Sequence, residues 1–247
     1  MSLSCSGIRK TYGAFVALDG VSLGVEPGEV LGIAGPNGAG KTTLFDVLSG
    51  RVRPEAGRVV LAGRDITALP PHARARLGLG RTFQAPLVPT ALTVAETLAA
   101  VRRAWGRTVE QAVVDHACEL VRLGACGSIV AGSLDTLGRR KLLLASLLMR
   151  RPSVLLLDEP ASGLLTAEIE EMDAIIRAIV AETGAALIVV EHRLELLFSV
   201  SARVVVMDAG RSIAEGPPAE VFADPRVREA YFEAPGATWA PTAGVRA

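Results

Sequence analysis

The chain has 247 residues, with 26 Lys and Arg against 26 Asp and Glu, so its formal net charge is zero. Half of the residues are hydrophobic and 21% are charged, which excludes a disordered chain and allows a sizeable core. The balanced charge argues against nucleic acid as a partner, because such binding depends on excess positive charge. No apolar run reaches the roughly 18 residues of a membrane helix, and the first ten residues lack the pattern of a signal peptide. These features predict a cytoplasmic protein.

Short β-rich runs alternate with helical ones, which is typical of an α/β fold. The first two predicted strands are joined by a loop that carries Tyr12. The third is a fully apolar run, which leads into a glycine-rich segment and a helix up to residue 48. The last two form a hairpin around Ala209-Gly210. The predicted strands cover residues 3–8, 21–25, 30–34, 57–61, 154–157, 186–190, 203–208 and 211–214.

Between about residues 84 and 151 the strand signal fades and helices are expected instead. Thr93 and Glu96 have the spacing of a capping box, which predicts a helix to about residue 103. Two further helical segments are expected at about 109–123 and 140–149. Beyond them, Thr166 is expected to cap the helix that follows the strand at 154–157. The Pro- and Ala-rich residues 234–247 are expected to form a tail.

The glycine-rich segment matches the phosphate-binding pattern G-x-x-x-x-G-K-[ST], between a strand and a helix. Glycines let successive backbone N–H groups approach phosphate oxygens, and the helix adds its positive end. The alternative is an ordinary strand-to-helix turn, which the complete pattern disfavours. We expect the Lys41 ammonium to contact the β- and γ-phosphates and the Thr42 hydroxyl to bind Mg²⁺. The segment, which predicts ATP binding, runs Gly35-Pro36-Asn37-Gly38-Ala39-Gly40-Lys41-Thr42-Thr43.

Two carboxylates follow the apolar strand at 154–157. Ligand sites in parallel sheets lie at the carboxyl ends of strands. Asp158 is therefore expected to hold Mg²⁺ opposite Thr42, and Glu159 to polarise the water that attacks the γ-phosphate. An acidic pair after a strand is usually just a solvated strand end. The phosphate-binding segment upstream favours the catalytic interpretation here.

Together these residues resemble the nucleotide-binding subunit of an ABC transporter, over about residues 3–232. The resemblance implies that Tyr12 stacks on adenine. It implies that Gln84, in Arg-Thr-Phe-Gln, links Mg²⁺ and the γ-phosphate to the membrane subunits. It also implies that His192 contacts the γ-phosphate. A lone Tyr, Gln or His is more often a core or surface residue; their spacing from the phosphate-binding segment supports these roles.

The family's fold is a P-loop NTPase: a RecA-like α/β core with an antiparallel β edge, plus a helical subdomain. The resemblance implies an ATPase domain over 3–233, with its core at 3–84 and 152–233 and the helical lobe at 85–151. The segments 80–84, 92–96, 190–192, 206–217 and 224–231 are similar to ATPases of branched-chain (hydrophobic) amino-acid importers.

This similarity implies a particular assembly and location. The expected partners are a second ABC ATPase subunit, two integral-membrane permeases and, indirectly, a solute-binding protein. The chain is then expected at the cytoplasmic face of the inner membrane, as a peripheral subunit. Alternatives are a weakly hydrolysing regulatory subunit of a heterodimer, an exporter ATPase, or a soluble ABC ATPase in DNA repair or translation.

The sequence departs from the family at two positions. The family signature, Leu-Ser-Gly/Tyr-Gly-Gln, corresponds to residues 134–139, where either Asp135 or, with a one-residue shift, Thr136 replaces the serine. We favour the shift because it keeps a hydroxyl and a glycine near the helix N-terminus. In addition, Leu165 stands where a polar residue is usual. Both departures fall where the family expects contact with a second ATPase subunit.

Overall fold

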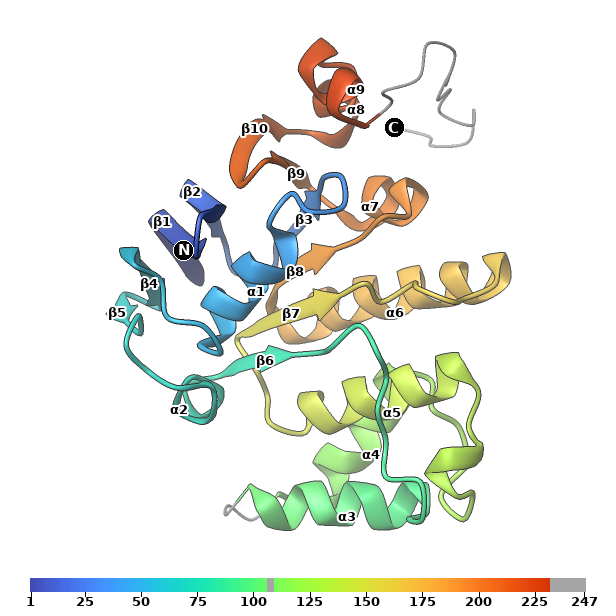
Figure 1. Ribbon diagram of the computed structural model, residues 1–247. Coiled ribbons are helices and arrows are strands. Elements are labelled where there is room, and N and C mark those ends of the chain that lie inside the picture. Colours follow the sequence, from blue (N-terminus) through green and yellow to red (C-terminus); the bar gives the residue numbers. More distant parts are fainter. Residues whose placement is uncertain (106–108, 232–247) are drawn as a thin grey trace.

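A six-stranded, mostly parallel sheet forms the centre of the molecule, in a computed structural model that describes residues 1–105 and 109–231. Five of its strands are parallel, and only the last pairs in antiparallel fashion with its neighbour. This is the predicted α/β core with an antiparallel edge (Figure 1). Across the sheet the strands are β10 (Arg211–Gly216), β9 (Arg203–Asp208), β3 (Val30–Ala34), β8 (Ala186–Val190), β7 (Val154–Asp158) and β6 (Leu79–Arg81).

A separate antiparallel sheet has the order β2-β1-β4-β5. Its strands are β1 (Leu3–Tyr12), β2 (Phe15–Val25), β4 (Ala56–Leu61) and β5 (Arg64–Asp65). The prediction of two short strands joined by a long loop was wrong, because β1 and β2 form one long hairpin that includes Tyr12. Irregular register along this hairpin interrupts the two-residue alternation that would have revealed it.

The helix α1 (Lys41–Ser49) lies between the two sheets (Figure 1). Leu44, Phe45 and Leu48 are fully buried there, against residues of both sheets. On the opposite face of the six-stranded sheet lies α6 (Thr166–Thr183). In β7, Leu156 belongs to the hydrophobic core that contains α1, on one face of the sheet. Leu155 and Leu157 belong to the core that contains α6, on the other face. Burial on both faces explains why the central strands are continuous apolar runs.

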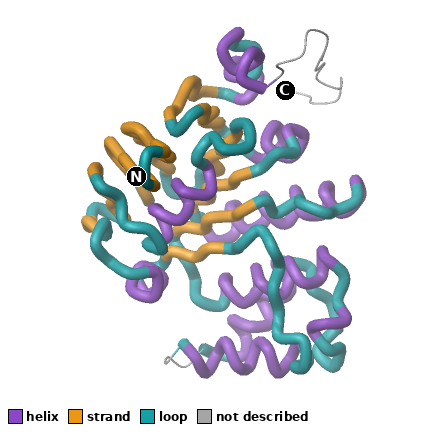
Figure 2. The backbone as a smooth tube through the Cα atoms, in the orientation of Figure 1, coloured by secondary structure: helices purple, strands orange, loops and turns teal. Residues whose placement is uncertain are grey.

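A group of helices lies at one end of the molecule, beyond β6 and β7 (Figures 1 and 2). It comprises α3 (Val94–Ala104), α4 (Gln111–Leu120) and α5 (Thr136–Leu148), with a 3₁₀ turn at Ala131–Ser133. The capping box that begins α3 is confirmed: Thr93 Oγ1 accepts from the Glu96 N–H, and the Glu96 carboxylate accepts from the Thr93 N–H. The boundaries of the predicted helical lobe, 85–151, stay a prediction.

Two helix starts differ from expectation. Helix α5 begins at Thr136 rather than residue 140, because the Asp135 carboxylate accepts from the Gly138 N–H and caps it. Helix α6 begins at Thr166, so Leu165 and not Thr166 occupies the cap position. There the Leu165 N–H donates to the Glu168 carboxylate. The remaining helices are α2 (Pro71–Arg76), α7 (Leu194–Val200), α8 (Pro218–Val221) and α9 (Pro225–Tyr231).

The predicted tail, 234–247, lies outside the described residues. Within 1–105 and 109–231, no helix combines the length and the apolarity needed to cross a bilayer.

Candidate active site

The candidate site lies at the carboxyl ends of four neighbouring parallel strands. The phosphate-binding segment follows β3, His192 follows β8, the acidic pair ends β7, and Gln84 follows β6. Because neighbouring parallel strands end at the same edge, residues far apart in the sequence meet there. The topology therefore unites four of the five segments in which site residues were predicted.

The loop 35–40 between β3 and α1 requires glycine at both ends. A Cβ on Gly35 would lie 2.2 Å from the Met207 carbonyl oxygen, and one on Gly40 would lie 2.4 Å from that of Ala17. Both residues also have positive φ, 149° and 100°, where a side chain is strained. The loop backbone is thus fixed in a shape that only glycine allows at these points.

Lys41 folds back over this loop. Its ammonium donates to the carbonyl oxygens of Gly35, at 2.6 Å, and Pro36, at 2.8 Å. The residue is only 6% exposed, and burial lowers the pKa of the ammonium, while the nearby Glu159 carboxylate raises it. An ammonium has three donor hydrogens, one more than these carbonyls use, so Lys41 can also bind a phosphate oxygen.

Three predicted catalytic side chains meet directly. The Glu159 carboxylate accepts from Gln84 Nε2 at 2.8 Å through one oxygen and lies 3.2 Å from His192 Nε2 through the other. Glu159 has a φ of 48°, an uncommon conformation for a residue with a side chain. Its own N–H donates to the Val190 carbonyl oxygen at 2.9 Å, which ties this unusual turn to β8. A carboxylate held in this way can orient a water molecule and accept its proton.

Asp158 is 6% exposed and lies beside Arg81, a residue that the sequence analysis did not single out. One Arg81 nitrogen donates to Asp158 Oδ2 at 3.0 Å and another to Asp46 Oδ1 at 2.6 Å. Burial raises the pKa of the Asp158 carboxyl, and the Arg81 guanidinium opposes that shift. Asp158 is thus a buried carboxyl group that lies next to a fixed cation.

The oxygen donors predicted for Mg²⁺ are the Asp158 carboxylate, the Thr42 hydroxyl and the Gln84 amide. Mg²⁺ prefers such oxygen ligands and usually keeps several waters, so this donor set fits the ion without a protein cage. The described residues contain no group of three or more His, Cys, Asp or Glu side chains that could hold a metal ion. The Mg²⁺ site at Thr42, Gln84 and Asp158 stays a prediction.

Tyr12 lies apart from these residues, at the end of β1 in the antiparallel sheet. It is 49% exposed, and the Lys10 ammonium lies 5.2 Å from its ring centroid. An exposed aromatic face beside a cation can stack on a flat, electron-rich ring. The predicted role in adenine binding stays a prediction.

The segment aligned with the family signature forms the N-terminus of α5. Asp135 is the capping residue and Thr136 the first helical residue, so the carboxylate and the hydroxyl lie side by side at this helix end. The Asp135 Oδ1 accepts from the Gly138 N–H at 2.7 Å, which occupies one donor that an anion would otherwise use. Leu165 is 73% exposed at the start of α6.

Two further charged residues contact the site from inside the protein. Glu191 is 1% exposed and accepts backbone N–H groups from Ala161, His192 and Arg193. Arg140, on α5, donates to the Ser162 carbonyl oxygen at 2.7 Å and reaches that of Gln84 at 3.5 Å. The only sequence signal for Glu191 is its place next to His192, and Arg140 had none.

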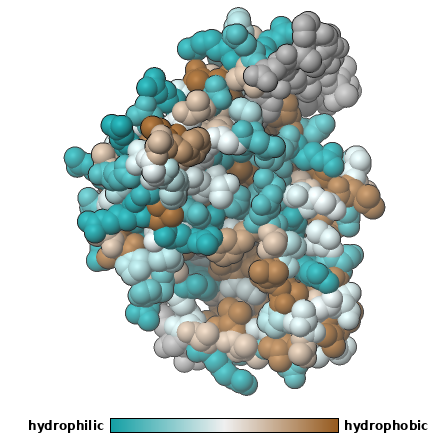
Figure 3. Space-filling view, viewed as in Figure 1, coloured by the Kyte–Doolittle hydropathy of each residue, from teal (hydrophilic) through white to brown (hydrophobic). Residues whose placement is uncertain are grey.

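A groove of about 390 Å³ lies beside Gln84, between β6, α3 and α5. We call it the Leu87 groove, after a leucine that is 82% exposed at its edge. The space-filling view shows apolar surface on the face over which the segment from β6 to α3 passes (Figure 3). The groove is lined by Arg81, Thr82, Phe83, Ala85, Leu87, Val101, Leu143, Ser146, Leu147 and Arg150.

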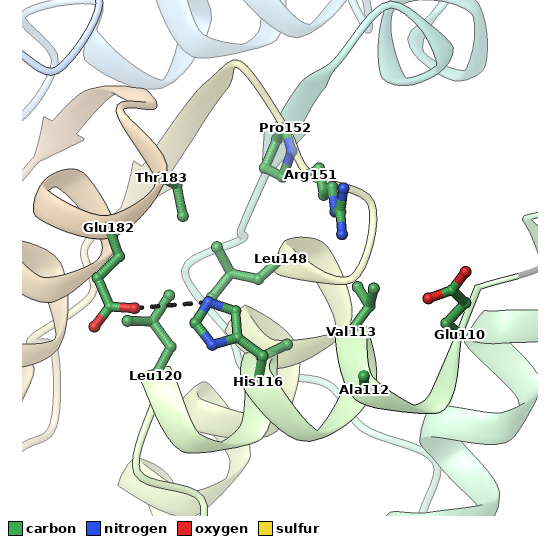
Figure 4. Close-up of a pocket in the computed structure, with 11 residues that line it drawn as sticks. Glu110, Ala112, Val113, His116, Leu120, Leu148, Arg151, Pro152, Glu182 and Thr183 are labelled. Atoms are coloured by element: carbon green, nitrogen blue, oxygen red, sulfur yellow. Dashed lines mark ion pairs between the residues drawn. The ribbon is translucent and has the colours of Figure 1, made fainter.

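A second cavity of about 390 Å³ lies between α4 and the ends of α5 and α6. His116 and Glu182 face each other across it, 3.6 Å apart (Figure 4). Pro152 in its wall precedes β7, so the cavity is at the opposite edge of the sheet from the candidate site. None of the predicted site residues lines it.

Known proteins resemble this chain over most of its length. Residues 18–162 match the family model for the ABC transporter, and residues 211–232 match the model for the branched-chain amino acid ATP-binding cassette transporter. The chain is 35% identical to the high-affinity branched-chain amino acid transport ATP-binding protein BraF of Pseudomonas aeruginosa, over 93% of this chain and 97% of that protein. It is 34% identical to the lipopolysaccharide export system ATP-binding protein LptB of Acidithiobacillus ferridurans, over 93% and 96%.

The solved structures that resemble the chain have the same architecture. An ATP-binding cassette of an ABC transporter, in its ADP conformation, superimposes with a TM-score of 0.84 at 30% identity, covering 93% of this chain and 97% of that one. A nucleotide-free cassette gives a TM-score of 0.82 at 29% identity, covering 93% and 98%. The P-loop NTPase fold predicted from the sequence is confirmed.

Proposed function

This chain belongs to the ABC transporter family, as one of its ATPase subunits, and we propose that it energises uptake of branched-chain amino acids or a related small polar solute. The observation that carries the importer assignment is the match of residues 211–232 to the branched-chain amino acid model, beside the full-length similarity to BraF. The similarity to LptB keeps an exporter ATPase as the alternative. The match of residues 211–232 favours the importer over that alternative.

The roles in nucleotide binding follow from the chemistry of the loop 35–43. Its N–H groups and the α1 N-terminus supply partial positive charge, and the Lys41 ammonium adds a full one. Mg²⁺, held by Thr42, Asp158 and Gln84, would neutralise charge on the phosphates. Tyr12 would stack on the adenine from the antiparallel sheet.

Hydrolysis is assigned to the cluster around Glu159. Its carboxylate is the acceptor for the proton of the attacking water, while Gln84 and His192 fix its orientation from two sides. His192 can then exchange its contact with Glu159 for one with the γ-phosphate. Catalysis of this kind consists of positioning and charge stabilisation, without a covalent intermediate on the protein.

The Leu87 groove is proposed as the docking surface for a membrane permease. It is mostly apolar, and Gln84, which contacts Glu159, leads directly into it. An intracellular segment of a permease lodged there could sense the state of the catalytic cluster through residues 84–87. The complete transporter would contain two permeases, a second ATPase subunit and, outside the membrane, a solute-binding protein, with this chain peripheral at the cytoplasmic face.

Uptake of labelled amino acids tests the assignment. Deleting the gene from its host should lower the initial rate of uptake of leucine, isoleucine and valine, or of one related solute. Expression of the wild-type chain should restore that rate. The control is uptake of a labelled sugar, which should not change. Normal uptake of the three amino acids and of the related solutes in the deletion strain would contradict the importer assignment.

A further inference from the structure

The buried carboxylate of Glu191 belongs to neither nucleotide binding nor hydrolysis as assigned above, yet it lies between the two segments that carry Glu159 and His192. A carboxylate that is 1% exposed has lost its hydration and needs hydrogen-bond donors in return. Its Oε1 accepts from the Ala161 N–H at 2.5 Å. Its Oε2 accepts from the N–H groups of His192, at 3.1 Å, and Arg193, at 3.3 Å.

These contacts join the two loops just beyond the point where β7 and β8 pair, at Asp158 and Val190. Ala161 lies two residues after Glu159, in the turn that begins with the unusual φ of Glu159. His192 and Arg193 lie between β8 and α7. Glu191 itself is anchored, because its N–H donates to the Ile33 carbonyl oxygen of β3 at 3.3 Å. One carboxylate therefore connects the sheet, the Glu159 turn and the His192 segment.

We propose that Glu191 is a positioning residue. Its carboxylate holds the turn at 159–161 and the segment at 192–193 in fixed positions relative to each other, so that the 3.2 Å contact between Glu159 and His192 can form. The inference rests on the proposed hydrolytic function of that pair. In this proposal Glu191 contacts neither the nucleotide nor the attacking water, but it determines where the side chains of Glu159 and His192 lie.

Both carboxylate oxygens are necessary for this role. A glutamine has one oxygen and one NH₂ group, so it can accept on one side only and presents donors to donors on the other. Glu191→Gln therefore keeps the volume but breaks either the bond to Ala161 or the bonds to His192 and Arg193. Arg140, which donates to the Ser162 carbonyl oxygen, leaves that turn partly tethered, so the substitution should misplace the segments rather than unfold them.

The kinetic test uses the assembled transporter with Glu191→Gln on this chain. We expect kcat for ATP hydrolysis to fall on the order of tenfold to a hundredfold, since small misplacements of catalytic groups have effects of that size. KM for ATP should stay within about twofold, because the residue does not contact the binding loop. The matched control is Glu195→Gln, an exposed carboxylate on the next helix, which should leave both constants unchanged. An unchanged kcat in Glu191→Gln, or an equal loss in the control, overturns the proposal.

A double substitution separates positioning from general stability. If Glu191 acts through Glu159, adding Glu191→Gln to Glu159→Gln should cost little further activity. A merely structural role would instead give multiplicative losses and a lowered Tm.

Amide hydrogen exchange on the isolated chain gives a readout that does not depend on transport. Glu191→Ala should speed exchange at Ala161, His192 and Arg193 but not in β7. A wild-type complex without ATPase activity would refute the proposed function, whereas unchanged exchange at Ala161 would refute this inference alone.

Discussion

Lys41, Asp158 and Glu191 are charged residues that are almost fully buried at one edge of the sheet. Burial opposes the charged form of each one, lowering the pKa of Lys41 and raising those of Asp158 and Glu191. The protein offsets this cost locally, with two carbonyl groups, one guanidinium and three N–H groups respectively. Charges held at such a cost are typical of functional sites.

Replacing Lys41 tests the binding site. Lys41→Ala removes the full charge aimed at the phosphates, and hydrogen bonds to charged groups contribute about 1.5–3 kcal/mol. ATP affinity, measured by calorimetry, should therefore fall roughly tenfold to a hundredfold. The control is Arg226→Ala, which removes an exposed cation paired with Asp224 near the C-terminus and should not change affinity. If Lys41→Ala binds ATP as tightly as the wild type, the assignment of loop 35–43 is wrong.

The candidate site could be predicted from the sequence to the extent that each residue had a fixed distance from a motif. Lys41 and Thr42 belong to a local pattern, and Glu159 directly follows an apolar strand. Arg81 and Arg140 could not be predicted, because their partners Asp158 and Ser162 are brought to them only by strand pairing and helix packing. Long-range contacts of this kind leave no spacing in the sequence.

At the scale of elements, the central strands were predicted well because burial on both faces makes them continuous apolar runs. The hairpin of β1 and β2 was not predicted in full, because its register irregularities remove the alternation of polar and apolar residues. The start of α5 was placed four residues late, because an aspartate cap at residue 135 was interpreted as part of an altered motif. A capping residue is a short local signal, so it is easily interpreted as part of another motif.

The Leu87 groove gives a prediction at this scale. Leu87→Asp places a charge on an 82% exposed apolar side chain, so the fold should tolerate it while an apolar contact with a permease should not. Co-purification with the permeases should be lost, and ATP affinity of the chain should be unchanged. Ile129→Asp, at a 44% exposed residue of the same helical region outside the groove, is the matched control and should co-purify normally. Unimpaired assembly of Leu87→Asp would mean that the permease docks elsewhere.

At the scale of the whole molecule, the family resemblance implies that each ATP lies between the binding loop of one subunit and the signature of the other. In this chain the loop, Glu159 and His192 are complete, whereas the segment 134–139 presents the Asp135 carboxylate at the helix end. A carboxylate near a triphosphate costs on the order of 1 kcal/mol or more, less where water screens it. If the partner ATPase has an ordinary signature, the site built on this chain's Lys41 is the faster one.

The steady-state ATPase rate of the assembled transporter with Glu159→Gln on this chain tests the central claim directly. Glutamine cannot accept the proton of the attacking water but preserves the shape of the site, so ATP should still bind with wild-type affinity while most of the turnover disappears. The equivalent substitution in the partner subunit should remove a smaller share of the ATPase turnover. Wild-type turnover in a transporter whose only change is Glu159→Gln on this chain would contradict the assignment of Glu159 as the catalytic base.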